Sequence, residues 1–492
     1  MKINIMMTTK HSSICILKQV KSLLGEAWLG SFCLFAAILV SPLVGESEGV
    51  FAQNITPDML SSFEKEVKVT GASRAIKNAL AANSVASIAL NQDNQTEKDT
   101  YFSNSVPSKG ITDQQSSGRC WLFTGLNVLR SKMINEQSLE GMEFSQNYLF
   151  FYDQLEKSNL FLQAIIDTRE KPQDDRTVMW LFQNPLSDGG TFTGVADLVA
   201  KYGVVPAGVM PETYGSNHTS TFTPYLKRKL REDALALRAD AKAKPATLQK
   251  QKEQYLAEIY RMLVLTLGEP VKEFTWAPKD KNGKYKTQPK KYTPQSFYKE
   301  YINLDLQNDY VMLMNDPSRE LWKTYEIQYD RHTYDGHNWL YLNLPMEEIK
   351  EAAIASIKDS TMMYFSCDVS KFLDRKTGIA DLNNYSYDDI FGVKFGMNKA
   401  QRVSSFDSGS THAMTLKAVD LDADGKPVKW MVENSWGATS GHKGHIIMTD
   451  EWFDNYMFRL VVNKKYLSEK VLKAAQQKPT MLPCWDPMFA AE

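Results

Sequence analysis

The division of the chain into a helix-rich first half and a strand-rich second half is the feature that most limits its fold. Apolar residues recur at helical spacing over 145–161, with Ser145 as a plausible N-cap. After a last predicted helix at 346–358, five runs have strand character: TMMYFSCDV, THAMTLKAVDL, KPVKWMVENSW, GHIIMTD and FRLVVN. The loop DADGKP joins two of these runs and predicts a hairpin. Helices followed by antiparallel strands predict an α+β fold.

The composition is that of a globular protein large enough for a substantial core. The 492 residues are 43% hydrophobic and 23% charged, which are ordinary proportions for a folded domain. A formal net charge of −1 does not favour a nucleic-acid or membrane-surface protein as a whole. Residues 225–268 differ, because two charged amphipathic stripes on either side of Pro245 predict a pair of helices. Together with the segment that follows, they form a predicted helical insertion at about 225–345.

The N-terminus has the features of a secretory signal. Four lysines precede an uncharged run at 27–45, whose centre WLGSFCLFAAILV is strongly apolar. The sequence VFA offers a cleavage site before Gln53, and residues 43–45 offer a second. We therefore predict that residues 1–52 are a signal peptide and that the protein is exported, either periplasmic or secreted, with no stable membrane partner after cleavage. An uncleaved membrane anchor and a start at a later methionine are the alternatives.

Cysteine usage argues against a disulfide scaffold. Of the five cysteines, Cys15 and Cys33 lie within the predicted signal. The remaining three, Cys120, Cys367 and Cys484, are widely spaced and odd in number, so we predict no disulfide framework. The chain has no CxxC or HExxH motif, and we expect neither a metal site nor a cofactor.

The stretch QQSSGRCWLF at 114–123 places a cysteine between a polar turn and an apolar helix. Residues 116–118 form the turn, and the predicted helix begins near Cys120 and is apolar almost all round as far as Arg130. A helix N-terminus favours negative charge, so a thiol there should ionise more readily to the nucleophilic thiolate. An inert core cysteine is the alternative interpretation.

A nucleophilic cysteine needs a base and a group that orients this base. Among the seven histidines, His412 alone lies inside a strongly apolar strand pattern, THAMTLKAV. Asn434 follows 22 residues later, in VENSWG on the next strand of the hairpin. Its amide oxygen can accept a hydrogen bond from the imidazole, and Trp436 can shield that bond from water. A structural histidine and a turn asparagine are the alternative interpretations.

A lysine-rich run, PKDKNGKYKTQPKKY, surrounds an Asn-Gly turn at 278–292. It predicts an exposed hairpin. The lysines of this hairpin, from Lys279 to Lys291, are also compatible with a basic patch that binds nucleic acid or another polyanion.

Taken together, the motifs resemble those of the papain-like cysteine peptidases. A glutamine six residues before Cys-Trp, a strand histidine and Asn-Ser-Trp-Gly form that pattern. The resemblance implies that Gln114 donates its side-chain amide to an oxyanion hole, together with the backbone N–H of Cys120. It also implies that Gly189 and Gly190, in the sequence DGG, pair with the bound peptide, and Gly190 is the better match. With Trp436, these glycines are the candidate substrate contacts.

Six motifs narrow the resemblance to the bleomycin hydrolase and aminopeptidase C branch. They are SSGRCWLF, DGGTF, KYGVVP, THAMT, VENSWG and the closing LPCWDPMFAAE, and the match runs from about residue 55 to the end. The 292 residues between Cys120 and His412 exceed the roughly 130–150 of cathepsins, and the predicted insertion accounts for the excess. Members of this branch are usually intracellular, so a cytoplasmic location is the alternative to export.

The resemblance implies a papain-like fold over 53–492, in which a helical half carries the cysteine and an antiparallel β half carries the histidine and the asparagine. It implies a cysteine aminopeptidase that acts through a thioester, needs no cofactor and assembles as a homohexamer. A C-terminal tail at about 480–492 would lie in the active-site cleft, where the terminal carboxylate of Ala491 or Glu492 binds the free amine of the substrate. An endopeptidase on the same scaffold and a non-catalytic polyanion-binding protein are the alternatives.

Overall fold

The computed structural model describes residues 54–67, 69–95 and 99–488, so the predicted signal peptide lies outside the described residues. The chain divides into two units, of which the first ends at Arg74 and the second begins at Ala75. The first unit holds α1 (Pro57–Glu66), which starts after the N-cap Thr56 and buries none of its side chains. Within the described residues, no helix combines the length and the hydropathy needed to cross a bilayer.

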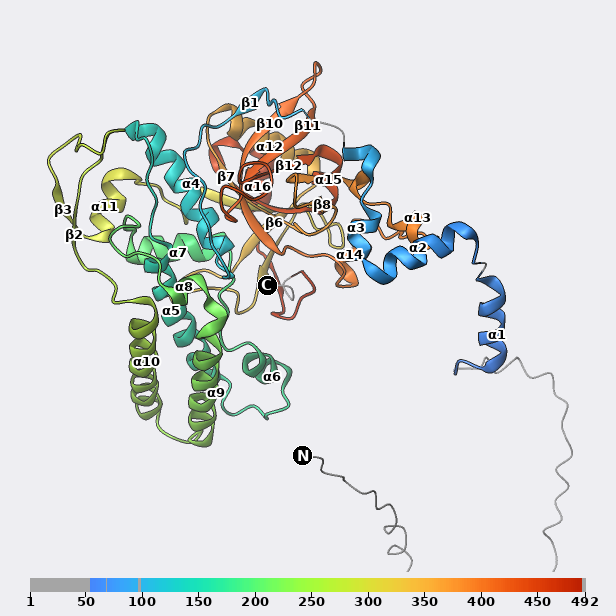
Figure 1. The fold of residues 1–492 in the computed structure, drawn as a ribbon. Coiled ribbons are helices and arrows are strands. Elements are labelled where there is room, and N and C mark those ends of the chain that lie inside the picture. The colour runs from blue at the N-terminus through green and yellow to red at the C-terminus, as the bar shows by residue number, and fades with distance from the viewer. Residues whose placement is uncertain (1–53, 68, 96–98, 489–492) are drawn as a thin grey trace, which may run out of the picture. The chain divides into compact units, whose positions relative to one another are not determined.

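Helices form the first part of the second unit (Figure 1). α4 (Cys120–Gln137) starts at the candidate nucleophile and buries most of its residues. α5 (Gln146–Asp167) starts after Ser145, whose side chain accepts a hydrogen bond from the amide of Tyr148, so the predicted N-cap is confirmed. The other helices before the main strands are α2 (Gly71–Ala82), α3 (Val85–Ala89), α6 (Arg176–Gln183), α7 (Phe192–Tyr202), α8 (Tyr214–Asn217), α9 (Thr223–Ala239), α10 (Pro245–Leu267) and α11 (Pro294–Tyr301).

Most of the strands among the described residues join one mixed 12-stranded sheet. Its order is β14-β5-β6-β4-β13-β7-β10-β11-β12-β9-β8, with β1 paired to β10. The centre of the sheet, from β4 to β12, is antiparallel as the sequence predicts, whereas three pairs nearer its ends are parallel. The strands are β1 (Asn104–Ser105), β4 (Tyr310–Met314), β5 (Lys323–Ile327), β6 (Leu340–Asn343), β7 (Met363–Cys367), β8 (Leu373–Asp374), β9 (Ile379–Ala380), β10 (His412–Leu421), β11 (Pro427–Glu433), β12 (His445–Thr449), β13 (Met457–Asn463) and β14 (Thr480–Leu482).

The predicted hairpin between the two motif-bearing strands is present. β10 pairs antiparallel with β11, and Thr415 lies opposite Glu433 in the register. Because His412 begins β10 and Asn434 directly follows β11, the hairpin brings both residues to the same end of the sheet. The helices that accompany the strands of this half are α12 (Met346–Lys358), α13 (Tyr387–Phe391), α14 (Lys399–Ser404), α15 (Asp450–Tyr456) and α16 (Glu469–Ala475).

The segment 225–345, predicted as a helical insertion, is helical only in its first part. α9, α10 and α11 lie there, but residues 310–343 contain β4, β5 and β6, which belong to the main sheet. The prediction of a helical insertion is therefore wrong for this stretch. YVMLM, KTYEI and LYLN are rich in β-branched, aromatic and apolar residues, and they bury these side chains by pairing with one another and with β13.

The cysteine-bearing helix lies on one face of the sheet. α4 packs directly against β10 and β7. Successive residues of β7 point to opposite faces, so Tyr364 joins the core formed with α4 and α5, and Phe365 joins a second core formed with α12 and α15. Packing on the face of the sheet that α4 covers therefore holds the start of α4 against the start of β10.

Candidate active site

A hydrogen bond joins His412 and Asn434 at the end of the β10–β11 hairpin. Nε2 of His412 lies 2.8 Å from Oδ1 of Asn434, and the amide of Ser435 donates to the same oxygen. The imidazole stacks on the indole of Trp436, with 4.8 Å between the ring centroids. Both His412 and Asn434 are buried. Because the asparagine oxygen accepts the Nε2 proton, Nδ1 is the ring nitrogen that can take a proton from a nucleophile.

Cys120 lies against the strand that His412 begins. Its thiol interacts with the backbone amide of Ala413, the residue after His412, and with the amide of Trp121. Burial raises the pKa of the Cys120 thiol, and this effect exceeds the lowering by the two amides and by the guanidinium of Arg459. The expectation that a helix start makes the thiol ionise more readily is therefore wrong for the free protein, because desolvation outweighs the favourable dipoles.

Burial also keeps the candidate base neutral. It lowers the pKa of His412 to about 4, although the hydrogen bond to Asn434 opposes the shift, and the nearby Arg375 lowers the pKa further. Burial therefore disfavours the charged form of both the Cys120 thiol and the His412 imidazole. Ionisation of the thiol is then coupled to transfer of its proton to the histidine.

Gln114 is held at both ends of its side chain. Oε1 accepts a hydrogen bond of 2.7 Å from the hydroxyl of Ser435, and Nε2 donates one of 2.6 Å to the carbonyl of Ser117. The backbone amide of Gln114 donates to the carbonyl of Ser435 at 2.8 Å. The second hydrogen on Nε2 makes no bond to a described residue, so the amide can donate it to a ligand.

Asp188 connects the cysteine loop to the candidate glycine pair. Its carboxylate accepts a hydrogen bond of 2.7 Å from the amide of Gly118, and its carbonyl accepts one of 2.8 Å from the indole of Trp121. A Cβ atom at Gly118 would lie 2.5 Å from the Asp188 carboxylate, so a larger residue there would displace Asp188. The N–H and C=O of Gly190 make no hydrogen bond to any residue that the structure describes, and both can pair with an extended peptide.

Comparisons with known proteins agree with this geometry. A model of the Peptidase C1-like family matches residues 54–489. Bleomycin hydrolase of Homo sapiens is 41% identical over 402 residues, which cover 79% of this chain and 88% of that protein. Aminopeptidase C of Streptococcus thermophilus is 37% identical over 439 residues, which cover 88% and 97%. The chain belongs to the Peptidase C1-like family. The crystal structure of PepW from Lactobacillus rhamnosis HN001 matches with a TM-score of 0.85 at 37% identity, covering 89% of this chain and 99% of that one.

This Peptidase C1-like chain is a cysteine aminopeptidase with the papain-like α+β fold. The resemblance to bleomycin hydrolases and aminopeptidases C, which the sequence motifs predict, is confirmed. Across the part of the chain that the structure describes, no group of three or more His, Cys, Asp or Glu side chains could hold a metal ion.

The described part of the C-terminal tail is tied to the rest of the fold. Cys484 and Trp485 line a cavity whose wall includes Gly189 and Gly190. The guanidinium of Arg176 lies 4.1 Å from the indole centroid of Trp485. Asp486 pairs with Arg319, and Met488 is fully buried. The tail therefore shares the cavity wall with the glycine pair at Cys484 and Trp485, whereas Ala491 and Glu492 lie outside the described residues.

The lysine-rich run forms a hairpin, as predicted. β2 (Phe274–Trp276) pairs antiparallel with β3 (Lys290–Tyr292). Four of its six lysines contact groups of this chain: Lys286 donates to the last carbonyls of α4, Lys279 lies over the ring of Tyr285, and Lys290 and Lys291 pair with Glu300 and Glu273. Most of the lysines of this hairpin therefore interact with other residues of the chain.

The sequence did not point to three further residues around the site. Ser435 orients Gln114, Asp188 joins the cysteine loop to the glycines, and His332 packs behind them. The ring of His332 is buried, 4.6 Å from that of Trp121. Asp188 could have been found from its place in the DGG motif. The polar sequence around His332 has no pattern that distinguishes this buried histidine from one on the surface.

Proposed function

We propose that this chain removes N-terminal residues from peptides with Cys120 as the nucleophile and His412 as its base. The thiol proton passes to Nδ1 of His412, while Asn434 holds the Nε2 proton. The thiolate attacks the scissile carbonyl, and collapse of the tetrahedral intermediate forms a thioester and releases the leaving amine, which takes the proton from His412. Water then gives its proton to His412 and hydrolyses the thioester. The hydrogen bond of 2.8 Å between His412 and Asn434 carries this proposal.

In this proposal, the side-chain amide of Gln114 and the backbone N–H of Cys120 stabilise the negative charge of the tetrahedral intermediate. The support for this role is the position of Gln114, whose side chain is oriented by Ser435 and Ser117 before substrate arrives. Donors that need no reorientation stabilise a developing charge better than mobile ones. Gln114→Ala should therefore lower kcat on the order of 10²–10³-fold, whereas a change confined to KM would contradict this role.

We further propose that the free amine of the substrate is recognised by the carboxylate at the end of the tail, carried by Ala491 or Glu492. The support is that Cys484 and Trp485 of the tail line the same cavity as Gly190, and that Met488 is buried four residues before the end of the chain. A carboxylate in a partly desolvated cleft pairs strongly with an ammonium group. The tail would also block longer substrate segments, which limits the cut to one residue from the N-terminus.

Hydrolysis of matched peptides with free and acetylated N-termini tests the proposal. We expect turnover of the free peptide, loss of turnover after alkylation of the thiol, and little cleavage of the acetylated peptide. Cys120→Ala should abolish hydrolysis while the circular dichroism spectrum and melting temperature stay unchanged. His412→Ala should be almost as severe, and Asn434→Ala milder, because orientation contributes less than the nucleophile. Residual turnover in Cys120→Ala would exclude this cysteine.

Two alternatives predict different outcomes of the same assays. An endopeptidase would cut the acetylated peptide as well as the free one. A polyanion-binding protein would show steeply salt-dependent binding to nucleic acid and no thiol-dependent hydrolysis. The internal contacts of Lys286, Lys290 and Lys291 favour hydrolysis over this second alternative.

Assembly and location are further proposals, and both rest on sequence resemblance and motifs. We propose a homohexamer, which sedimentation equilibrium of the mature protein tests by its mass. We propose export after cleavage before Gln53, which mass spectrometry of the protein from its native host tests. A monomer would contradict the first proposal, and an intact N-terminus in the cytosol would contradict the second.

A further inference from the structure

A cavity of about 350 Å³ lies beside the glycine pair. Its walls come from α5, α6, the segment 184–190, residues 327–332 and the tail residues Cys484 and Trp485. Apolar side chains line much of it, including Phe161 and Trp180. Its volume is near the lower end of the roughly 300–1,000 Å³ of small-molecule pockets, and it suits a single amino-acid side chain with a long apolar stem.

Contacts outside the cavity fix the backbone of Gly189 and Gly190, which form part of its wall. Lys157 donates to the carbonyl of Gly189 at 2.6 Å and forms an ion pair of 3.0 Å with Asp153. Asp153 also accepts a hydrogen bond of 2.5 Å from Nδ1 of His332. A Cβ atom at Gly190 would lie 2.2 Å from the His332 ring. These buried contacts preform the backbone next to which a substrate would lie.

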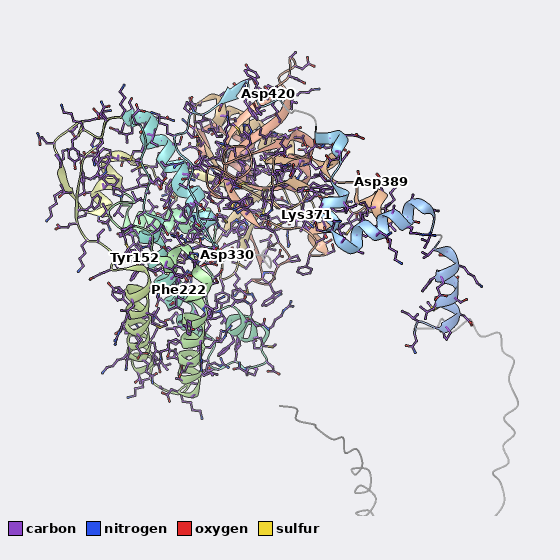
Figure 2. All side chains as sticks on the ribbon, viewed as in Figure 1. Tyr152, Phe222, Asp330, Lys371, Asp389 and Asp420 are labelled. Carbon is purple, nitrogen blue, oxygen red and sulfur yellow. The ribbon has the colours of Figure 1, made fainter. Side chains whose placement is uncertain are left out.

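Asp330 supplies an acidic group to the same cavity. It lies in the loop between β5 and β6, near the centre of the view in Figure 2, and its carboxylate makes no hydrogen bond or ion pair with a described residue. Burial raises the pKa of Asp330, although His332, Arg459 and Lys157 lie near enough to oppose the shift. The Asp330 residue is half-buried on the cavity wall, and a partly buried carboxylate without a hydrogen-bond partner is a candidate for binding a cation.

The neighbouring cations already have other partners. Lys157 and His332 share Asp153, as described above. Arg459 donates to the hydroxyl and the carbonyl of Ser410 and lies 4.1 Å from the ring centroid of Trp339. Arg459 also lies near enough to attract the carboxylate of Asp330. Asp330 is therefore an acidic residue of the cavity lining that makes no hydrogen bond or ion pair with a described residue.

We propose that this cavity binds a cationic group of the substrate's N-terminal residue and that Asp330 pairs with that cation. The proposal rests on the aminopeptidase function and names its substrate class. A lysine or arginine side chain would place its apolar stem against Phe161 and Trp180 and its charge at Asp330. The α-ammonium group of any N-terminal residue is the other source of the same chemistry, and substrates with neutral side chains distinguish the two.

Aminoacyl-coumarylamides with a free amine test the source of the cation. In Asp330→Asn, kcat/KM for lysyl and arginyl substrates should fall about tenfold or more, while methionyl and norleucyl substrates keep their rates. An equal fall for all four substrates would support recognition of the α-ammonium group by the same carboxylate. Unchanged rates for all four, or faster turnover of the basic substrates, would overturn the proposal. Asp335→Asn is the matched control, because Asp335 lies on the same loop but is exposed and pairs with Lys201.

A binding measurement separates failure of this proposal from failure of the proposed chemistry. Lysine amide and norleucine amide are titrated into Cys120→Ala and into Cys120→Ala/Asp330→Asn by calorimetry. A preference for lysine amide that disappears in the second protein supports a subsite for a side-chain cation, and this result does not depend on hydrolysis. Loss of affinity for both amides in the second protein supports recognition of the α-ammonium group. Equal affinities of both amides for both proteins would overturn the assignment of Asp330, whatever the peptidase assay shows.

Discussion

The hydroxyl of Ser435 donates a hydrogen bond of 2.7 Å to the side-chain oxygen of Gln114, across 321 positions of the sequence. Ser435 also donates its backbone amide to Asn434. One residue therefore contacts both the group that orients the base and the proposed oxyanion donor. Because Ser435 occupies Oε1 of Gln114, the amide nitrogen is turned towards the loop that ends at Cys120.

Ser435→Ala should lower kcat about tenfold, a smaller effect than that of Gln114→Ala. Loss of the hydroxyl leaves Oε1 of the glutamine without its buried donor and frees the amide to rotate, which costs roughly 1–3 kcal/mol. Steady-state kinetics on a free peptide should show this loss in kcat with little change in KM. Thr439→Ala, at an exposed position on the same loop, is the control. An unchanged kcat in Ser435→Ala would show that the hydroxyl does not orient the donor.

The local parts of the fold could be predicted from the sequence. Ser145 caps α5, the loop at 422–426 turns the hairpin, and α12 has the predicted bounds of 346–358. Each depends on residues a few positions apart, so the chemistry of caps and turns is sufficient. The candidate catalytic set was also identifiable, because its motifs resemble a known family.

The long-range parts could not be predicted. β4, β5 and β6 lie in a stretch read as a helical insertion, and their pairing with β13 and β14 joins segments more than a hundred positions apart. The direction of the Cys120 pKa was missed for a related reason. A helix start favours the thiolate, but the sequence does not show that packing of α4 on β10 desolvates the thiol.

The acid limb of the pH–rate profile should lie near pH 4. His412 must be neutral to take the thiol proton, and burial lowers its pKa from 6.5 to about 4, so the base stays competent as pH falls until it protonates near that value. The measurement is kcat/KM for a methionyl substrate from pH 3.5 to 8. Arg375→Gln removes a cation that lowers this pKa and should move the limb to higher pH, whereas Lys376→Gln, at the exposed next position, should not. A wild-type midpoint near 6.5 would contradict a desolvated base.

A buried ion pair joins the two halves of the active site. Arg130 of α4 pairs with Glu433 of β11, the residue before Asn434, and the side chains are 3% and 1% exposed. Arg130→Met leaves the glutamate buried without its partner and should lower the free energy of unfolding by roughly 3–5 kcal/mol. Arg130→Met/Glu433→Leu should recover part of this loss, because the unpaired carboxylate is gone, while the buried Lys417 loses its attraction to Glu433.

Urea denaturation measures the cost of breaking that ion pair. Lys132→Met is the control, since it breaks the exposed pair of Lys132 and Glu136 on the same helix and should cost about 1 kcal/mol or less. If the double variant is no more stable than Arg130→Met, the loss comes from packing of the guanidinium stem rather than from an unpaired carboxylate.

Removal of the last four residues should change where the enzyme cuts relative to the N-terminus of its substrate. Because Met488 is fully buried, truncation after it leaves the packed part of the tail intact. If the terminal carboxylate binds the substrate amine, the truncated enzyme should lose aminopeptidase activity about tenfold or more and gain cleavage of acetylated and internal sites. Glu492→Gln retains a terminal carboxylate, so it should behave like the wild type and serves as the control. Mass spectrometry of the products locates each cut, and a truncated enzyme that still releases only single N-terminal residues would show that the tail does not set the cleavage position.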